Sequence, residues 1–273
     1  MKINFDQVPA YIKREITVGE AGLFKGKKGK QVQRVQEWLA VHGFHTVIDG
    51  DYGPATNSAV RGFQKVKGLD DTGAVDQATW SLLCKPMDSA LRAPSKRPLS
   101  INALVEFFAR RHLKQNPKEI GGSNRGPWVR LYCDGNDGRE WAWCAGFVSL
   151  IVRQAYFYFD KKPPMEGSVS CDTLAAQGKS AGLFIKGQDL RSGKIKVADL
   201  TFPLIFLRKK THNDWNHTGF VMGVEGEGKD LVFITIEGNT NNLGHREGVE
   251  ACARRRSVAS GNYDFLKVEA RVE

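Results

Sequence analysis

The chain has few cysteines, and they do not form a recognisable framework. The five thiols are odd in number, widely spaced and never in a CxxC pair, which argues against both a disulfide scaffold and a zinc site. We therefore predict no metal and no cofactor. The cysteines are Cys84, Cys133, Cys144, Cys171 and Cys252.

Long apolar runs are also missing. No stretch approaches about 18 uninterrupted apolar residues, so we predict no membrane span. The opening segment, MKINFDQVPAYIKREITVGE, lacks the apolar centre of a signal peptide. We expect a protein that is made in the cytoplasm and that needs another factor to carry or release it if it acts outside.

The sequence has no low-complexity tract, and we find no internal repeat of roughly 20 to 50 residues. Its composition is 41% hydrophobic and 26% charged, so disorder is not predicted. A chain of 273 residues can bury a core of useful size and is expected to fold as two domains.

Acidic residues are outnumbered, and the formal net charge is +10. Such a chain is attracted to polyanions such as nucleic acid, acidic lipid or an anionic cell wall. The basic runs lack the interleaved aromatic residues of a strand-binding groove, so nucleic acid is not predicted as a partner. We interpret each run as solvated surface. The runs are KGKKGK (25–30), RKK (208–210) and RRR (254–256).

Residues 30–84 have the pattern of three short helices. Apolar residues recur at helical spacing over residues 32–39 and 55–66, and a glycine follows each run. Pro54 suits the first turn of the second helix, and Asp76 suits the cap of a third. We predict a small all-α domain over residues 1–87.

Residues 88–99 are polar, contain two prolines and lack periodicity, so we predict a linker there. Residues 100–273 form the predicted second domain. Its first part has helical patterns, and strand patterns follow at 200–207, 217–224 and 231–238. Helices followed by antiparallel strands indicate the α+β class.

Cys144 stands where an apolar helix begins, in the stretch WCAGFVSLIV. The free N–H groups and partial positive charge of a helix N-terminus stabilise a thiolate and, later, an oxyanion. Ala145 and Gly146 leave room beside it for a substrate carbonyl. A cysteine in this position is more often a packing residue, so a catalytic role requires a base nearby. The other four cysteines lack such neighbours in the sequence and are interpreted as structural or surface thiols.

The strand pattern selects His217 as that base. If the turn in EGEGKD centres near Glu227, His217 lies opposite Glu237 in an antiparallel hairpin. Asn239 then falls on the same face, two residues further on. A turn shifted by one residue would change which of Glu237 and Asn239 orients the histidine, so both remain candidates. If His217 is not the base, His212 or His245 would have to be.

Residues 30–84 resemble the three-helix peptidoglycan-binding domain found beside many wall hydrolases. The resemblance implies bacterial peptidoglycan as a partner and suggests Asp49, Tyr52 and Gln64 as wall contacts. The motifs that carry it are VQEWL (35–39), DGDYGPAT (49–56), AVRGFQ (59–64), GL (68–69), TG (72–73) and DQATW (76–80).

Residues from about 100 onward resemble the CHAP family of cysteine- and histidine-dependent amidohydrolases and peptidases, through WCAGFV (143–148), HTGFV (217–221) and EGN (237–239). The resemblance implies a papain-like α+β fold in which Cys144 is the nucleophile and His217 the base, with Glu237 and Asn239 completing the site. Trp143 is a candidate substrate contact. Residues 159–199 match no known motif, which leaves the choice of substrate open.

These observations together predict a peptidoglycan hydrolase that cuts an amide bond of the peptide stem, as an N-acetylmuramoyl-L-alanine amidase or an endopeptidase. A catalytically inactive wall-binding protein and a papain-like protease acting on protein are the alternatives. A phage lysin and an antibacterial effector injected into competing cells both suit the pattern, and an effector would imply an immunity protein as partner. The sequence does not determine the oligomeric state.

Overall fold

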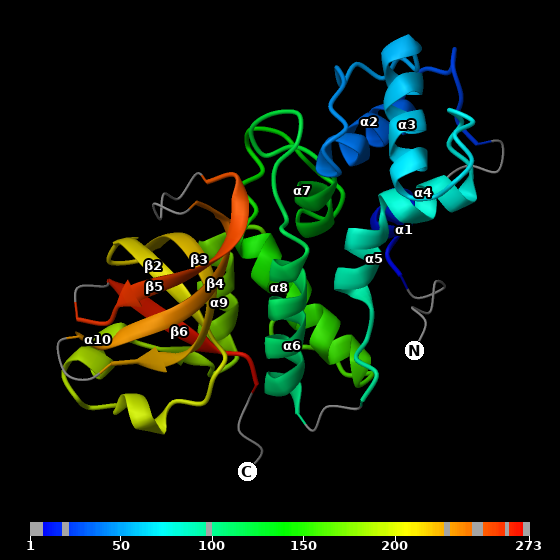
Figure 1. The fold of residues 1–273 in the computed structure, drawn as a ribbon. Coiled ribbons are helices and arrows are strands. Elements are labelled where there is room, and N and C mark those ends of the chain that lie inside the picture. Colours follow the sequence, from blue (N-terminus) through cyan, green and yellow to red (C-terminus); the bar gives the residue numbers. More distant parts are fainter. Residues whose placement is uncertain are drawn as a thin grey trace. The chain divides into compact units, whose positions relative to one another are not determined.

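The computed structural model describes residues 8–17, 22–96, 100–226, 230–241, 248–259 and 262–269. The chain divides into two compact units (Figure 1). We call residues 2–92 with 119–140 the helical unit, and residues 93–118 with 141–273 the sheet unit. The division near residue 92 falls inside the predicted linker. Residues 119–140, which the prediction placed in the second domain, pack with the first.

The helical unit contains the three predicted helices, which are α2, α3 and α4. Pro54 opens α3, and Asp76 caps α4 by accepting a hydrogen bond from the Thr79 amide at 2.7 Å. Three further helices among the described residues of this unit were not predicted. One of them, α5, includes residues 88–91 of the predicted linker and buries Met87 and Ala90. The helices are α1 (Ala10–Ile16), α2 (Lys30–Val41), α3 (Pro54–Val66), α4 (Gln77–Leu83), α5 (Lys85–Leu91) and α7 (Pro127–Tyr132).

A buried glutamine of α2 holds the turn that precedes α3. Gln36 Oε1 accepts from the Gly50 amide at 2.8 Å, while Nε2 donates to the Asp51 carbonyl at 3.1 Å and to Thr56 Oγ1 at 3.1 Å. Gly50 has a φ of 74°, a left-handed conformation that glycine adopts without steric cost. The glutamine thus joins a helix, a turn and the next helix.

A glutamine of α3 repeats this arrangement at the turn before α4. Gln64 Oε1 accepts from the Gly73 amide at 2.9 Å, and Nε2 donates to the Ala74 carbonyl at 2.8 Å and to Thr79 Oγ1 at 3.0 Å. The two buried amides satisfy main-chain groups that would otherwise be left without partners. Gln64 therefore has the same structural role in its turn as Gln36 has in the preceding one.

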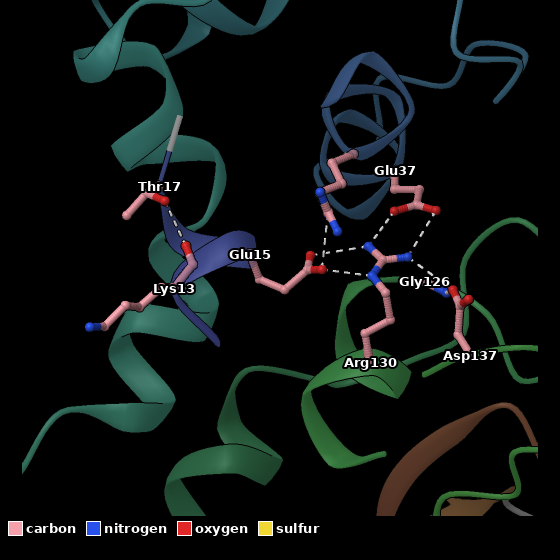
Figure 2. Close-up of polar contacts among 8 residues, drawn as sticks. Lys13, Glu15, Thr17, Glu37, Gly126, Arg130 and Asp137 are labelled. Atoms are coloured by element: carbon pink, nitrogen blue, oxygen red, sulfur yellow. Dashed lines mark hydrogen bonds and ion pairs between the residues drawn. The ribbon is translucent and has the colours of Figure 1, made fainter. Parts of the chain in front are cut away.

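A buried arginine joins α7 to α1 and α2 within the helical unit (Figure 2). Arg130 donates to both carboxylate oxygens of Glu15, at 2.7 and 3.1 Å, and to both of Glu37, at 3.2 and 2.5 Å. It also contacts Asp137 Oδ2 at 2.9 Å. Glu15 and Glu37 are almost completely buried. Removing α7 would leave these two carboxylates without their shared cation.

The sheet unit has the predicted α+β composition. The six strands in its described residues form one antiparallel sheet in the order β1-β6-β2-β3-β4-β5, drawn from yellow-green to red in Figure 1. The three predicted strands are confirmed as β2, β3 and β4, whereas β1, β5 and β6 were not predicted. The elements are α6 (Ile101–Lys114), α8 (Cys144–Tyr158), α9 (Cys171–Ser180), β1 (Phe184–Ile185), α10 (Gly187–Arg191), η2 (Val197–Asp199), β2 (Leu204–Thr211), β3 (Asp214–Glu225), β4 (Val232–Thr240), β5 (Glu250–Ser257) and β6 (Tyr263–Lys267).

Helix α8 packs against α6, β3 and β4, and α9 packs against β3. Phe147 of α8 meets Phe220 of β3 with ring centroids 6.3 Å apart. The next strand residue, Val221, points to the opposite face and joins a second apolar cluster with Phe206 and Phe265. Both faces of β3 are thus fixed by packing. Within the described residues, every helix is too short or too polar to cross a membrane.

Candidate active site

His217 of β3 and Glu237 of β4 form a buried hydrogen bond in the sheet unit. His217 Nε2 lies 2.8 Å from Glu237 Oε2, and both side chains are 0% exposed. The hairpin pattern predicted this partnership. The other ring nitrogen, Nδ1, makes no hydrogen bond to a nitrogen or oxygen atom of the described residues, so it is available to a thiol.

The two strands reach this pair through a register that differs from the predicted one. Phe220 lies opposite Ile236, which places Glu237 beside Gly219 instead of directly opposite His217. A Cβ atom added to Gly219 would lie only 2.7 Å from Glu237 Cγ. The carboxylate therefore passes over the glycine and meets the imidazole diagonally. The predicted turn centre, Glu227, lies outside the described residues.

Two further groups hold the Glu237 carboxylate. Arg256 of β5 donates through Nε to Oε1 at 2.6 Å and through Nη2 to Oε2, and Thr235 donates to Oε1. Burial raises the pKa of Glu237, but hydrogen bonds and charge from His217 and Arg256 outweigh it and lower the pKa to about 2. Glu237 is therefore a carboxylate at neutral pH. Arg256 was not among the predicted site residues, because the RRR run was interpreted as solvated surface.

Cys144 is the first residue of α8, as predicted, and it is buried. The side chain of the N-cap residue, Trp143, makes no capping hydrogen bond to this helix N-terminus. The pKa of Cys144 lies well below its usual value, first through the thiol of Cys171 and then through His217 and the main chain of Thr218, against burial, which raises it. These contacts favour a thiolate.

Burial by itself lowers the pKa of His217, but the neighbouring Cys144 and Glu237 outweigh that effect and raise it. A lowered thiol pKa beside a raised imidazole pKa favours a thiolate–imidazolium pair. The pKa values of two other thiols are shifted in the opposite direction from that of Cys144. Burial raises the pKa of Cys84 to about 12 and also raises the pKa of Cys252.

Cys171 was interpreted as a structural or surface thiol without a catalytic neighbour, but the structure places it beside Cys144. It is the first residue of α9, and its Sγ lies 4.0 Å from Cys144 Sγ. All five cysteines lie within the described residues, and none is in a disulfide. Segment 159–199, which matched no motif, therefore contributes a second thiol beside the candidate nucleophile. No local sequence pattern around Cys171 predicts its contact with Cys144, because the contact depends on how α9 packs in the folded sheet unit.

Asn239 supports the loop before the nucleophile instead of orienting the imidazole. It is 1% exposed. In the amide orientation that satisfies both groups, its oxygen accepts from the Trp143 amide at 3.2 Å and its nitrogen donates to the Gly248 carbonyl at 2.7 Å. The imidazole bond belongs to Glu237. Trp143 itself is 0% exposed, so its predicted contact with substrate stays a prediction.

His112 and His212 have surroundings different from those of His217. His112 of α6 is buried against Phe147, and burial lowers its pKa to about 4 despite a hydrogen bond with Gln154. His212 is exposed at the end of β2. His245 lies outside the described residues.

Of the three suggested wall contacts in the helical unit, two are buried. Tyr52 donates to the Gly73 carbonyl at 2.8 Å and is 0% exposed, and Gln64 is 1% exposed. Asp49 is exposed and accepts from Gln36 at 2.8 Å. Contact with the wall stays a prediction for all three residues, and the two buried side chains have structural roles.

Residues 28–83 match the family described as putative peptidoglycan binding domain. The match covers α2, α3 and α4 with both glutamine-held turns, and it supports targeting to the cell wall with peptidoglycan as a partner. A comparison with curated proteins finds no match for the chain. The matched residues lie entirely within the helical unit.

Proposed function

We propose that the protein is a peptidoglycan hydrolase in which the sheet unit cleaves an amide bond and the helical unit holds the enzyme on the wall. The observation that carries the proposal is the buried His217–Glu237 hydrogen bond at 2.8 Å, formed beside a cysteine of lowered pKa at a helix N-terminus. This is the nucleophile, base and orienting acid that acyl transfer requires. The peptidoglycan-binding domain supports the choice of substrate.

In the proposed reaction, the Cys144 thiolate attacks the carbonyl carbon of the amide. The resulting oxyanion is stabilised by main-chain N–H groups in the first turn of α8, where the side chain of the N-cap residue, Trp143, makes no capping hydrogen bond. His217 protonates the leaving amine, and the acyl-enzyme forms. His217 then takes a proton from water, the hydroxide attacks the thioester, and the carboxylate product leaves Cys144.

Glu237 remains ionised throughout this cycle, because its pKa is about 2. It therefore orients the imidazole and stabilises the imidazolium without exchanging a proton. Thr235 and Arg256 Nε hold Oε1, and Arg256 Nη2 shares Oε2 with the imidazole. This arrangement suits both the muramoyl–alanine bond and a bond between two amino acids of the stem.

A wall-binding unit on the same chain raises the effective concentration of the hydrolase at an insoluble substrate. The net charge of +10 is suited to an anionic wall. Release as a phage lysin and injection as an effector, with an immunity protein as partner, both fit this proposal. Gene neighbourhood distinguishes the two routes.

The test is digestion of purified peptidoglycan by the full chain, followed by mass spectrometry of the soluble products. Free lactyl groups paired with new alanine amines identify an amidase, and new amines within the stem identify an endopeptidase. Cys144→Ser should abolish the release, since removing a nucleophile costs several orders of magnitude in rate. Cys84→Ser is the matched control, because it removes a buried thiol from the helical unit.

Two results would contradict the proposal. If the wild type releases nothing while the full chain still sediments with peptidoglycan, the protein is a wall-binding protein without hydrolase activity. If casein is digested and peptidoglycan is not, the enzyme acts on protein. Retention of more than about a tenth of the wild-type rate in Cys144→Ser would exclude Cys144 as the nucleophile.

A further inference from the structure

Two thiols face each other at the starts of two helices in the sheet unit. Cys144 opens α8 and Cys171 opens α9, and their Sγ atoms are 4.0 Å apart. Both residues are buried, at 4% and 7% exposure. A disulfide has an S–S length of about 2.05 Å, so the two sulfurs need to approach by about 2 Å in total, a movement that both side chains share.

A chain of serine hydrogen bonds fixes the segment before α9 to the middle of α8. Ser149 Oγ donates to the Ser168 carbonyl at 2.8 Å and accepts from the Ser168 amide at 2.9 Å. Ser168 Oγ in turn accepts from the Ser170 amide at 3.0 Å, and the Ser170 side chain caps α9. The residue preceding Cys171 is thereby tied to the helix that carries Cys144.

A second attachment fixes the start of α9 to β3. Asp172, the residue after Cys171, accepts from the Trp215 amide at 2.8 Å. Trp215 is two residues before His217 in the same strand. The second thiol is thus held from both sides by hydrogen bonds, so its place beside Cys144 is built into the fold.

We propose that Cys144 and Cys171 form a redox pair, in which a hydroperoxide converts the candidate nucleophile into a reversible intramolecular disulfide. The Cys144 thiolate attacks one peroxide oxygen, the O–O bond breaks, and hydroxide or an alkoxide leaves, which gives a sulfenic acid on Cys144. The Cys171 sulfur then attacks the Cys144 sulfur, the S–O bond breaks, and water leaves with the proton of the Cys171 thiol.

The order of the two steps follows from the surroundings of the thiols. The low pKa of Cys144 makes it the thiol that a peroxide oxidises first. Cys171 lies at contact distance and resolves the sulfenic acid before it reaches the irreversible sulfinic state. An external dithiol returns two electrons and two protons and restores both thiols.

This inference rests on the proposed function only where it concerns activity, because the disulfide is a chemical modification that can be measured by itself. In the proposed hydrolase, the disulfide would remove the nucleophile under oxidising conditions and return it on reduction. A wall-targeted enzyme protected in this way survives peroxide exposure that would otherwise destroy its site.

The experiment treats the full chain with hydrogen peroxide, blocks remaining thiols with N-ethylmaleimide, and maps peptides by mass spectrometry without reduction. We expect the Cys144 and Cys171 peptides to be found as one linked species that has lost two hydrogen atoms. Dithiothreitol should separate them. In Cys171→Ser, the same treatment should drive Cys144 to sulfinic and sulfonic acids that dithiothreitol does not reverse. Cys84→Ser should retain the linked species.

Absence of the linked peptide at peroxide levels that oxidise Cys144 would overturn the proposal, as would equal reversibility in Cys171→Ser and wild type. Cys171→Ala provides a second variant should the serine perturb folding, which circular dichroism checks. If the linked peptide forms but the protein does not hydrolyse the wall, the redox pair is supported and the proposed hydrolase function is rejected. Wall hydrolysis without a linked peptide would support the hydrolase and reject the redox pair.

Discussion

Gly219 and Glu237 occupy neighbouring positions on β3 and β4, and the glycine makes room for the carboxylate. A Cβ atom at Gly219 would lie 2.7 Å from Glu237 Cγ and 2.8 Å from the Ile236 carbonyl. Contacts this short do not occur between real side chains, so any larger residue must displace its neighbour. The diagonal bond from Glu237 to His217 exists because residue 219 has no side chain.

We therefore expect Gly219→Ala to displace Glu237 and weaken the orientation of His217. Overpacking of this kind costs about 1–3 kcal/mol in stability, and the proposed activity should fall further than stability alone explains. Thermal unfolding and a peptidoglycan turbidity assay measure the two effects. Gly223→Ala on the same strand is the matched control, because no heavy atom of the described residues lies within 4 Å of its added Cβ. Equal behaviour of the two variants would contradict the argument.

Glu237→Gln tests the electrostatics of the site. The active form pairs a Cys144 thiolate with a His217 imidazolium, so the rate falls at low pH as the thiolate is protonated and at high pH as the imidazolium loses its proton. Glu237 contributes to the raised pKa of His217. Removing its charge lowers that pKa, and the alkaline limb of the pH–rate profile should move to lower pH by about one unit or more.

Glutamine keeps the shape of Glu237, and its amide oxygen can still accept from Thr235 and Arg256 Nε at the Oε1 position. Its amide nitrogen replaces Oε2 and loses the bond from Arg256 Nη2. The control is Glu225→Gln, which removes an exposed carboxylate at the other end of β3. Its pH–rate profile should match that of the wild type. An unchanged alkaline limb in Glu237→Gln would mean that His217 does not act as the base.

The sequence was sufficient for elements with a clear periodicity. The helices α2 to α4 and the strands β2 to β4 follow from apolar spacing and turn residues, because those signals are local. The pairing of His217 with Glu237 was also predicted. Its register was not, because Glu225 pairs with Val232, whereas a turn centred on Glu227 would pair it with residue 229. A β-bulge between Val221 and Gly223 then shifts the pairing by one residue.

The elements that the sequence analysis missed depend on distant contacts. Helix α7 has only six residues, too few for a helical period to be visible, and it is held by an arginine that reaches α1 and α2. Cys171 and Arg256 lie more than fifteen residues from their partners along the chain. Their roles become apparent only when α9 and β5 are placed beside α8 and β4.

Asn239 tests whether the loop before Cys144 must be held. Its φ is 52°, a conformation that asparagine and glycine tolerate better than alanine. Asn239→Gly removes the amide without backbone strain, and Asn239→Ala adds the strain. We expect both variants to lose activity through the freed Trp143 amide, with the alkaline limb unchanged because Glu237 still holds His217. A shifted limb in Asn239→Gly would mean that Asn239 also orients the imidazole.

Arg130 provides the most direct test of how the helical unit is assembled. Burial raises the pKa of Glu37, while Arg130 works against that shift. In Arg130→Met, Glu37 remains buried without its cation and Glu15 keeps only its ion pair with Arg34, and breaking a buried pair from one side costs about 3–5 kcal/mol. Thermal or urea unfolding should show this loss. Arg92→Met, at an exposed i,i+4 pair, should change stability by less than about 1 kcal/mol.

Adding Glu15→Gln and Glu37→Gln to Arg130→Met should recover part of the lost stability, because no uncompensated charge then remains buried. The same reasoning applies to truncation. A fragment of residues 1–92 lacks Arg130 and should be unstable and bind peptidoglycan weakly, although it contains all of residues 28–83 that match the binding domain. The fragment with both glutamine substitutions should be more stable than the unsubstituted one. If the 1–92 fragment is as stable as the full chain and binds as well, residues 119–140 are dispensable and Arg130 does not join them functionally to the wall-binding helices.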